Sequence, residues 1–196
     1  MPGLAVTLNG VDLVAVSTDG LNVLGVRVHG DVIGPEFAAI DVSGGLYGEG
    51  DNSKHLIWID QRELAAGDEI VVALLDSTTS SCPGKTIDEL YSEDESPIGP
   101  RQPLEEATQF ILKQPRVRER FNFVVTPPSG APIIASTEPT DHSFGFSVLW
   151  NWMHPKRVRV SLSSNSLENI VKRTGGVYQA SFYMHFGEAV RLRVDA

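Results

Sequence analysis

Cysteine is almost missing from this chain of 196 residues, and so is any long apolar run. Cys82 is the only cysteine, so an internal disulfide cannot form. No stretch approaches the ~20 apolar residues that a membrane-spanning helix needs. The first residues lack the basic and long apolar regions of a secretory signal. We therefore expect a cytoplasmic protein that does not act at a membrane.

Motifs of catalysis and of metal binding are also lacking. The chain has no G-x-S-x-G sequence, which would mark a hydrolase nucleophile. The histidines are scattered without the paired spacing of zinc ligands: His29, His55, His142, His154 and His185. We therefore predict no catalytic residue, no metal ligand and no cofactor, with an enzyme of unrecognised type as the remaining alternative.

The glycine-rich stretch 44–50 does not have the setting of a phosphate-binding loop. Such a loop opens a helix, whereas Asp51, Asn52 and a predicted strand follow here. Glu49 and Asp51 would repel phosphate. Glu49, Asp51 and Asn52 could contribute oxygens to Ca²⁺, but their spacing matches no complete ligand set. A hairpin loop over Gly44–Lys54 is the simpler interpretation.

Positive charge is scarce in the first half of the chain. Residues 1–100 hold 4 Lys or Arg and 17 Asp or Glu, a net charge of −13. Residues 101–196 hold 12 and 8, a net charge of +4, which together give the total of −9. This asymmetry predicts an acidic and a mildly basic side, unless the halves interleave. It argues against nucleic acid and favours a protein partner, in particular a basic one, or association between copies.

Alternation of apolar and polar residues with period two dominates the chain and predicts half-buried strands. The fold class that follows is all-β, as a sandwich or barrel-like structure with two short helices. The twelve expected strands are Leu4–Leu8, Val11–Ser17, Val23–Val28, Phe37–Val42, His55–Ile59, Glu69–Leu75, Phe121–Thr126, Pro132–Thr137, Phe144–Trp152, Arg157–Ser163, Tyr178–Phe186 and Glu188–Val194.

The two halves repeat one six-stranded pattern at an offset of 120 residues. Four apolar segments match at this offset, beginning at residues 13, 24, 38 and 70, and so does the turn at residue 67. We infer a tandem duplication. It divides the chain into an acidic first repeat (1–77), an acidic Ser/Pro/Gly-rich linker with a helix (78–116), and a mildly basic second repeat (117–196). Two compact β units in contact are expected; two repeats stacked face to face are the alternative.

Two helices and one helical turn have clear sequence signals. Ser166 can cap a helix over 166–174, which Gly175 can end. Pro103 suits the first turn of a helix over 103–114, which we expect to bridge the two repeats. A short helical turn is expected at Thr86–Tyr91, within the linker.

The aromatic strand near residue 150 supplies the candidate binding residues. Phe144, Phe146 and Val148 alternate as core residues, and Trp150 and Trp152 extend the same face beyond the matched core. Tryptophan is enriched in binding hot spots. A strip of arginines on neighbouring strands could bind an acidic partner or the acidic half of another copy. The candidate binding residues are Trp150, Trp152, Arg157, Arg159, Arg191 and Arg193.

These observations favour a noncatalytic protein-binding or assembly module. An immunity-type inhibitor of a basic toxin would suit the acidic first repeat. A β protein that binds a small molecule or a glycan through Trp150 and Trp152 is the alternative of a different class.

Overall fold

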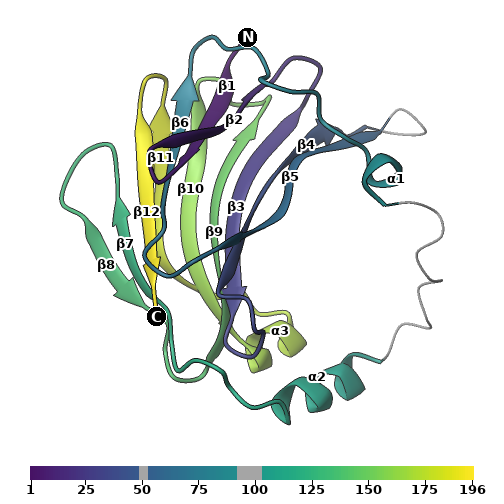
Figure 1. Ribbon diagram of the computed structural model, residues 1–196, viewed down its shortest axis with the longest axis vertical. Coiled ribbons are helices and arrows are strands. Elements are labelled where there is room, and N and C mark those ends of the chain that lie inside the picture. The colour runs from purple at the N-terminus through teal and green to yellow at the C-terminus, as the bar shows by residue number, and fades with distance from the viewer. Residues whose placement is uncertain (49–52, 92–102) are drawn as a thin grey trace.

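The structure is a computed structural model that describes residues 1–48, 53–91 and 103–196, and in these ranges it forms two antiparallel six-stranded sheets (Figure 1). Sheet A has the spatial order β2 (Val11–Ser17), β1 (Gly3–Leu8), β6 (Glu69–Leu75), β12 (Ala189–Asp195), β7 (Asn122–Thr126) and β8 (Ile133–Ser136). Sheet B has the order β11 (Val177–His185), β10 (Arg157–Ser166), β9 (Asp141–Asn151), β3 (Val23–Asp31), β4 (Ala38–Leu46) and β5 (Lys54–Leu64). The predicted β-rich fold is confirmed, as two sheets rather than a closed barrel.

One hydrophobic core fills the space between the sheets. Alternate residues of nearly every strand point into it, as the period-two pattern requires. Phe144, Phe146 and Val148, which were predicted to be core, are at most 2 % exposed. Burying an aliphatic or aromatic side chain of this size stabilises the fold by about 1.5–3 kcal/mol. The core draws on both halves of the chain, for example Val26, Val72, Val160 and Leu192.

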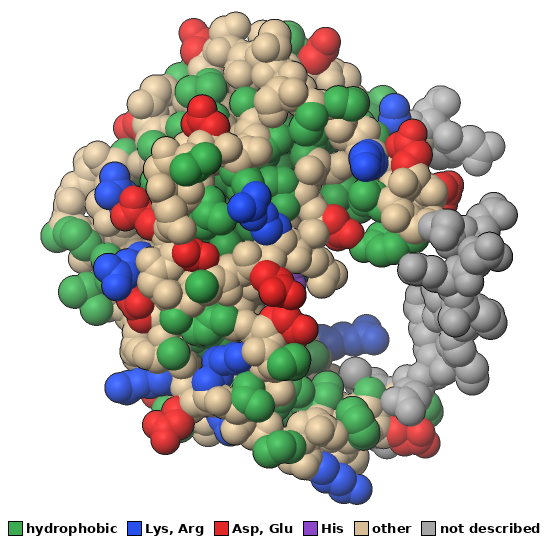
Figure 2. Space-filling view, viewed as in Figure 1, with side chains coloured by type: hydrophobic (Ala, Val, Ile, Leu, Met, Phe, Trp, Pro, Cys, Tyr) green, Lys and Arg blue, Asp and Glu red, His purple; other side chains and the backbone are tan. Residues whose placement is uncertain are grey.

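The two halves of the chain lie side by side. Each sheet takes three strands from each half, and the halves meet at the β6–β12 pair in sheet A and the β3–β9 pair in sheet B. The alternative of one half stacked face to face on the other is therefore wrong, because each sheet contains strands of both halves, whereas two compact units in contact stay a prediction. Acidic and basic side chains are interspersed on the face shown in Figure 2. The boundaries 1–77, 78–116 and 117–196 stay a prediction.

The predicted loop over Gly44–Lys54 is shorter than expected. β4 continues to Leu46 and β5 begins at Lys54, so Gly44 and Gly45 lie in a strand. A Cβ atom on Gly44 would lie 2.6 Å from the Val23 carbonyl oxygen, and one on Gly45 would lie 2.3 Å from the Lys54 carbonyl oxygen. These glycines therefore permit close strand packing rather than a turn. Residues 49–52, including the oxygen ligands considered for Ca²⁺, lie outside the described residues.

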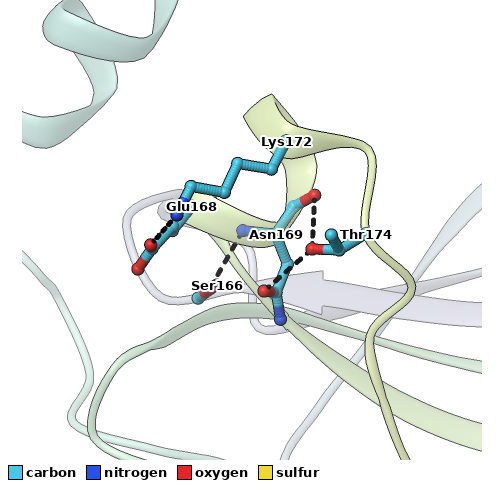
Figure 3. Close-up of polar contacts among 5 residues, drawn as sticks. All are labelled: Ser166, Glu168, Asn169, Lys172 and Thr174. Atoms are coloured by element: carbon cyan, nitrogen blue, oxygen red, sulfur yellow. Dashed lines mark hydrogen bonds and ion pairs between the residues drawn. The ribbon is translucent and has the colours of Figure 1, made fainter.

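Three short helices accompany the sheets: α1 (Ile87–Leu90), α2 (Leu104–Leu112) and α3 (Leu167–Lys172). Ser166 caps α3 as predicted, since its Oγ accepts a hydrogen bond from the Asn169 amide at 3.2 Å (Figure 3). The helix ends earlier than expected, with Arg173 rather than Gly175 in the left-handed conformation, at φ 52°. α2 does not bridge two units; it lies beside α3 at the end of the sandwich opposite the N-terminus (Figure 1). None of the described helices has the length and apolar character to cross a bilayer.

Residues 80–85 close one side of the sandwich. The amide of Ser81 donates to the Ala15 carbonyl of the edge strand β2 at 2.9 Å. Lys85 and Ile57 of the other edge strand, β5, exchange two backbone hydrogen bonds of 2.8 Å. On the opposite side, where β8 and β11 lie, no described segment pairs with either strand from outside. There a side-chain bond joins the sheets: Gln179 Nε2 donates to the Ser136 carbonyl at 2.8 Å.

Candidate functional site

The outer face of sheet B contains a polar trough that crosses β10, β9 and β3 and reaches Tyr178 of β11. Strand register explains how it forms. Ser163 of β10 lies opposite Gly145 of β9, and Gly145 lies opposite His29 of β3. Gly145 has no side chain, so the surface of the sheet is depressed at this position. Polar side chains of the two adjacent rows stand on either side of the depression.

The rows on each side of Gly145 are built from small and polar residues. On one side Ser161, Ser147 and Arg27 lie in register. On the other side Asn165, Ser143 and Asp31 lie in register. A Cβ atom added to Gly145 would meet no atom within 4 Å, so the floor is open to solvent. The hollow has a volume of about 300 Å³, and a second hollow of about 220 Å³ adjoins it through His29, Gly30 and Asp31.

Most polar groups of the trough have unused hydrogen-bonding capacity. Within the described part of the chain, no protein group hydrogen-bonds to the hydroxyls of the four serines, the side chain of Asn165 or the guanidinium of Arg27. A serine hydroxyl both donates and accepts, an amide does the same, and a guanidinium donates several bonds. The trough therefore offers donors and acceptors that converge on one place. The four serines are Ser143, Ser147, Ser161 and Ser163.

Charges of both signs are present in the trough. Arg27 lies in the same outer row as Asp41 of β4. His29 Nδ1 lies 3.3 Å from Asp41 Oδ2, an ion-pair distance without hydrogen-bond geometry. Asp31 Oδ1 accepts hydrogen bonds from the amides of Ile33 (2.9 Å) and Gly34. The central hollow is therefore close to electrically neutral and suits a polar ligand without net charge.

Two exposed tyrosine rings lie on β11, and that of Tyr178 borders the trough. Tyr178 and Tyr183 are 58 % and 53 % exposed. The Arg159 guanidinium carbon lies 5.5 Å from the centre of the Tyr178 ring, and that of Arg157 lies 4.3 Å from the centre of the Tyr183 ring. These cation–π contacts fix the arginine side chains along the outer face of the sheet.

The two candidate tryptophans are separated by the structure. Trp150 is only 4 % exposed and belongs to the core, and its Nε1 donates to the Pro155 carbonyl at 3.0 Å. It cannot stack on a ligand in this position, and the binding role predicted for Trp150 stays a prediction without support from its burial. Trp152 is 63 % exposed but lies beyond the end of β9, in the turn to β10. It does not share the face of Trp150, because the strand pattern stops at Asn151.

The four candidate arginines do not form one strip. Arg157 and Arg159 lie on the outer face of sheet B, whereas Arg191 and Arg193 lie on β12 in sheet A. Since outer faces of two packed sheets point in opposite directions, the pairs lie on opposite sides of the molecule. Arg191 contacts Glu69 at 3.1 Å and Arg193 contacts Asp195 at 3.1 Å. Only the first pair lies near the trough.

Within residues 1–48, 53–91 and 103–196, no group of three or more His, Cys, Asp or Glu side chains is placed to hold a metal ion. His55 Nδ1 contacts the Tyr47 hydroxyl at 2.5 Å, and burial raises the pKa of Tyr47. This pair lies at the ends of β4 and β5, away from the trough. It offers a hydrogen bond rather than an activated nucleophile.

The trough residues were missed because each is unremarkable alone. A signal was present in serine at alternate positions of two consecutive strands, Ser143 and Ser147 in β9 and Ser161 and Ser163 in β10. Period two places such serines on one face, but register decides whether they meet. Comparisons with protein-family models, with curated proteins and with solved structures found no match.

Proposed function

We propose that this protein is a noncatalytic binding module that holds a neutral, hydroxyl-rich ligand, such as a mono- or disaccharide unit of a glycan, in the trough of sheet B. The observation that carries the proposal is the convergence of four serine hydroxyls, Asn165 and Arg27 around the open floor at Gly145. This ligand class is the alternative predicted from the sequence, but the proposed binding residues are different. Trp150 is buried and Trp152 lies outside the trough.

Hydrogen-bond chemistry favours a ligand with many hydroxyl groups. Such a ligand presents alternating donors and acceptors, which hydroxyl and amide side chains match in either role. Tyr178 adds an exposed ring at one end, against which the apolar face of a sugar can pack. The central volume of about 300 Å³ suits a small ligand or one unit of a longer chain.

A titration of the isotopically labelled protein with neutral mono- and disaccharides tests the proposal by amide chemical shifts. We expect the largest shifts on β9, β3 and β10, around Gly145. The variant Gly145→Tyr should abolish them, because its ring would fill the floor while its Cβ meets no neighbour.

The matched control is Gly25→Tyr on the same face of β3. Gly25 does not line the trough, and a Cβ atom there meets Leu149 at an ordinary 3.5 Å. Ligand binding should survive in Gly25→Tyr. Shifts that are absent for every saccharide, or that persist in Gly145→Tyr, would refute a glycan site in the trough.

We also infer that the chain arose by tandem duplication, now supported by strand register. Val26 pairs with Val148 and Val28 pairs with Phe146, which relates the two halves at an offset of 120 by a local two-fold axis. Gly67 and Gly187, also 120 apart, both have positive φ in the turns before β6 and β12. The proposed match of Leu13–Ala15 at this offset is wrong, because it aligns buried Val14 with Ile134, which is 82 % exposed. An offset of 119 aligns Val14 with Ile133 and reproduces the hairpin register.

A protein-binding role is the second candidate function, and the open side of the sandwich at β11 favours it. The more specific hypothesis of an immunity-type inhibitor rested on a separate acidic half. That half occupies one side of the two-sheet fold, so the hypothesis stays a prediction. A cytoplasmic location stays part of the proposal and rests on the single cysteine.

A further inference from the structure

The edge strand β11 forms an uncovered edge of sheet B in the described part of the chain. It has nine residues and pairs only with β10. A one-residue bulge opposite Leu162 and Ser163 interrupts its register, which leaves Ala180–His185 as a regular segment. An edge strand exposes alternate unpaired N–H and C=O groups, which can accept another strand.

Two of the usual devices that block such an edge, charged residues and proline, are missing from β11. Residues 177–184 contain no charged residue and no proline, and Val177, Tyr178 and Tyr183 are more than half exposed. The other edges are protected differently. Residues 80–85 bond to β2 and, at Ile57, to β5. The rest of β5 contains the charged residues Asp60, Arg62 and Glu63, and β8 has only four residues. β11 is therefore open where the other edges are covered, charged or short.

Positive charge lies directly over this edge. Arg157 and Arg159 belong to the neighbouring strand β10, but their guanidinium groups lie against the rings of Tyr183 and Tyr178 on β11. No carboxylate of the described residues lies within 4 Å of either guanidinium, whereas Arg191 and Arg193 on sheet A each have one. Two arginines without an acidic partner lie beside this open edge. A strand that binds there should therefore carry carboxylates that pair with them.

We propose that β11 binds an extended acidic segment of another protein, which adds to sheet B as a seventh strand. Main-chain hydrogen bonds to Ala180–His185 supply affinity, and alternate side chains supply specificity. On the outer face, carboxylates of the segment lie beside Tyr183 and reach Arg157 and Arg159. On the other face, apolar side chains meet Phe182, which is half-buried at the edge.

A second copy of the chain fits this edge poorly. Pairing of β11 with its copy would bring the two arginine pairs together around a two-fold axis, where like charges repel. An acidic segment meets the same arginines with the opposite charge. Charge complementarity therefore selects a different protein as the partner.

The test uses a capped eight-residue peptide in which glutamate alternates with valine, titrated into the labelled full chain at low salt. Amide shifts should concentrate on residues 180–185, and the affinity should fall as salt screens the charges. The double variant Arg157→Gln, Arg159→Gln should weaken binding about tenfold or more, since two charge contacts are lost. The matched control Arg191→Gln, Arg193→Gln removes the same charge from the opposite face and should change the affinity less than twofold.

Two further samples separate this proposal from the trough and from self-association. A peptide with lysine in place of glutamate should not bind, whereas Gly145→Tyr should bind the acidic peptide normally, because the trough is a different site. The proposal is overturned by shifts that map away from β11, by binding that ignores the loss of Arg157 and Arg159, or by sedimentation showing a dimer that needs β11.

Discussion

Trp150 and Trp152 illustrate how strongly the location of one residue depends on the local turn. They are two residues apart, yet Trp150 is 4 % exposed and Trp152 is 63 % exposed. The chain leaves β9 after Asn151 and turns back, which places the Pro155 carbonyl over the Trp150 indole. A buried indole N–H needs such an acceptor, because an unsatisfied buried donor is costly.

Substitution of these two residues should give opposite results. Trp150→Phe removes the hydrogen bond to Pro155 and leaves its carbonyl unpaired, so the free energy of unfolding should fall by about 1–3 kcal/mol. Trp152→Ala should change it by about 0.5 kcal/mol or less, since the side chain is exposed. Urea denaturation followed by circular dichroism measures both. Equal effects of the two substitutions would contradict the burial of Trp150.

The capping box of α1 is a pH-dependent element. The backbone N–H of Thr86 donates to Glu89 Oε2 at 2.7 Å, and the Thr86 hydroxyl adds a second bond. These hydrogen bonds, the backbone one first, lower the pKa of Glu89 below its usual 4.5. A carboxyl with a lowered pKa in the folded state stabilises it above the unfolded pKa. That contribution is lost as the pH falls through the folded pKa.

The amide resonance of Thr86 should therefore titrate with a midpoint below 4.5. Its hydrogen bond to Glu89 breaks when the carboxyl is protonated, and proton-detected spectra from pH 7 to pH 2 record the change. Glu89→Gln is the matched variant, since an amide keeps the shape without the titration. A transition at Thr86 that persists in Glu89→Gln would show that another group causes it.

Strands and helices were predictable because their signals are local. Period two identifies a strand such as Val11–Ser17, and Ser166 identifies the start of α3. The neighbours of each strand were not predictable. The pattern of Ile70, Val72 and Leu74 predicts which face of β6 is buried. It does not predict whether β1, β5 or β12 pairs with this strand. Strand pairing depends on which surfaces fit together across the whole chain.

The candidate site was hidden for the same reason. Ser147 of β9 reads as an exposed polar residue, and it becomes part of a site only because β3 places Arg27 beside it. That pairing joins residues 120 apart in sequence across the local two-fold axis. The arginines show the converse, since Arg157 and Arg191 look equivalent in sequence and lie on opposite outer faces. The sequence pattern predicts which residues of a strand share a face. The topology decides which of the two sheets contains that strand.

At the scale of the whole molecule, neither half contains a complete sheet. Three strands from residues 1–77 and three from residues 117–196 make up each sheet, and their core side chains pack together. Chains covering 1–91 and 103–196, expressed separately, should remain largely unfolded alone and should assemble when mixed. Their thermal midpoint should rise with protein concentration, whereas that of the intact chain should not. Circular dichroism melts at several concentrations measure this, and a half that folds cooperatively by itself would contradict it.

The two sheets shared between the halves therefore make this protein equivalent to an obligate dimer whose two subunits share one backbone. In a true dimer each subunit must find its partner by diffusion, and dilution dissolves the fold. Here the covalent connection supplies a fixed effective concentration, so assembly does not depend on how much protein the cell contains. It also frees the two halves to differ, which allows one half to present the aromatic edge strand β11 beside the arginines of β10, while the other is closed by residues 80–85.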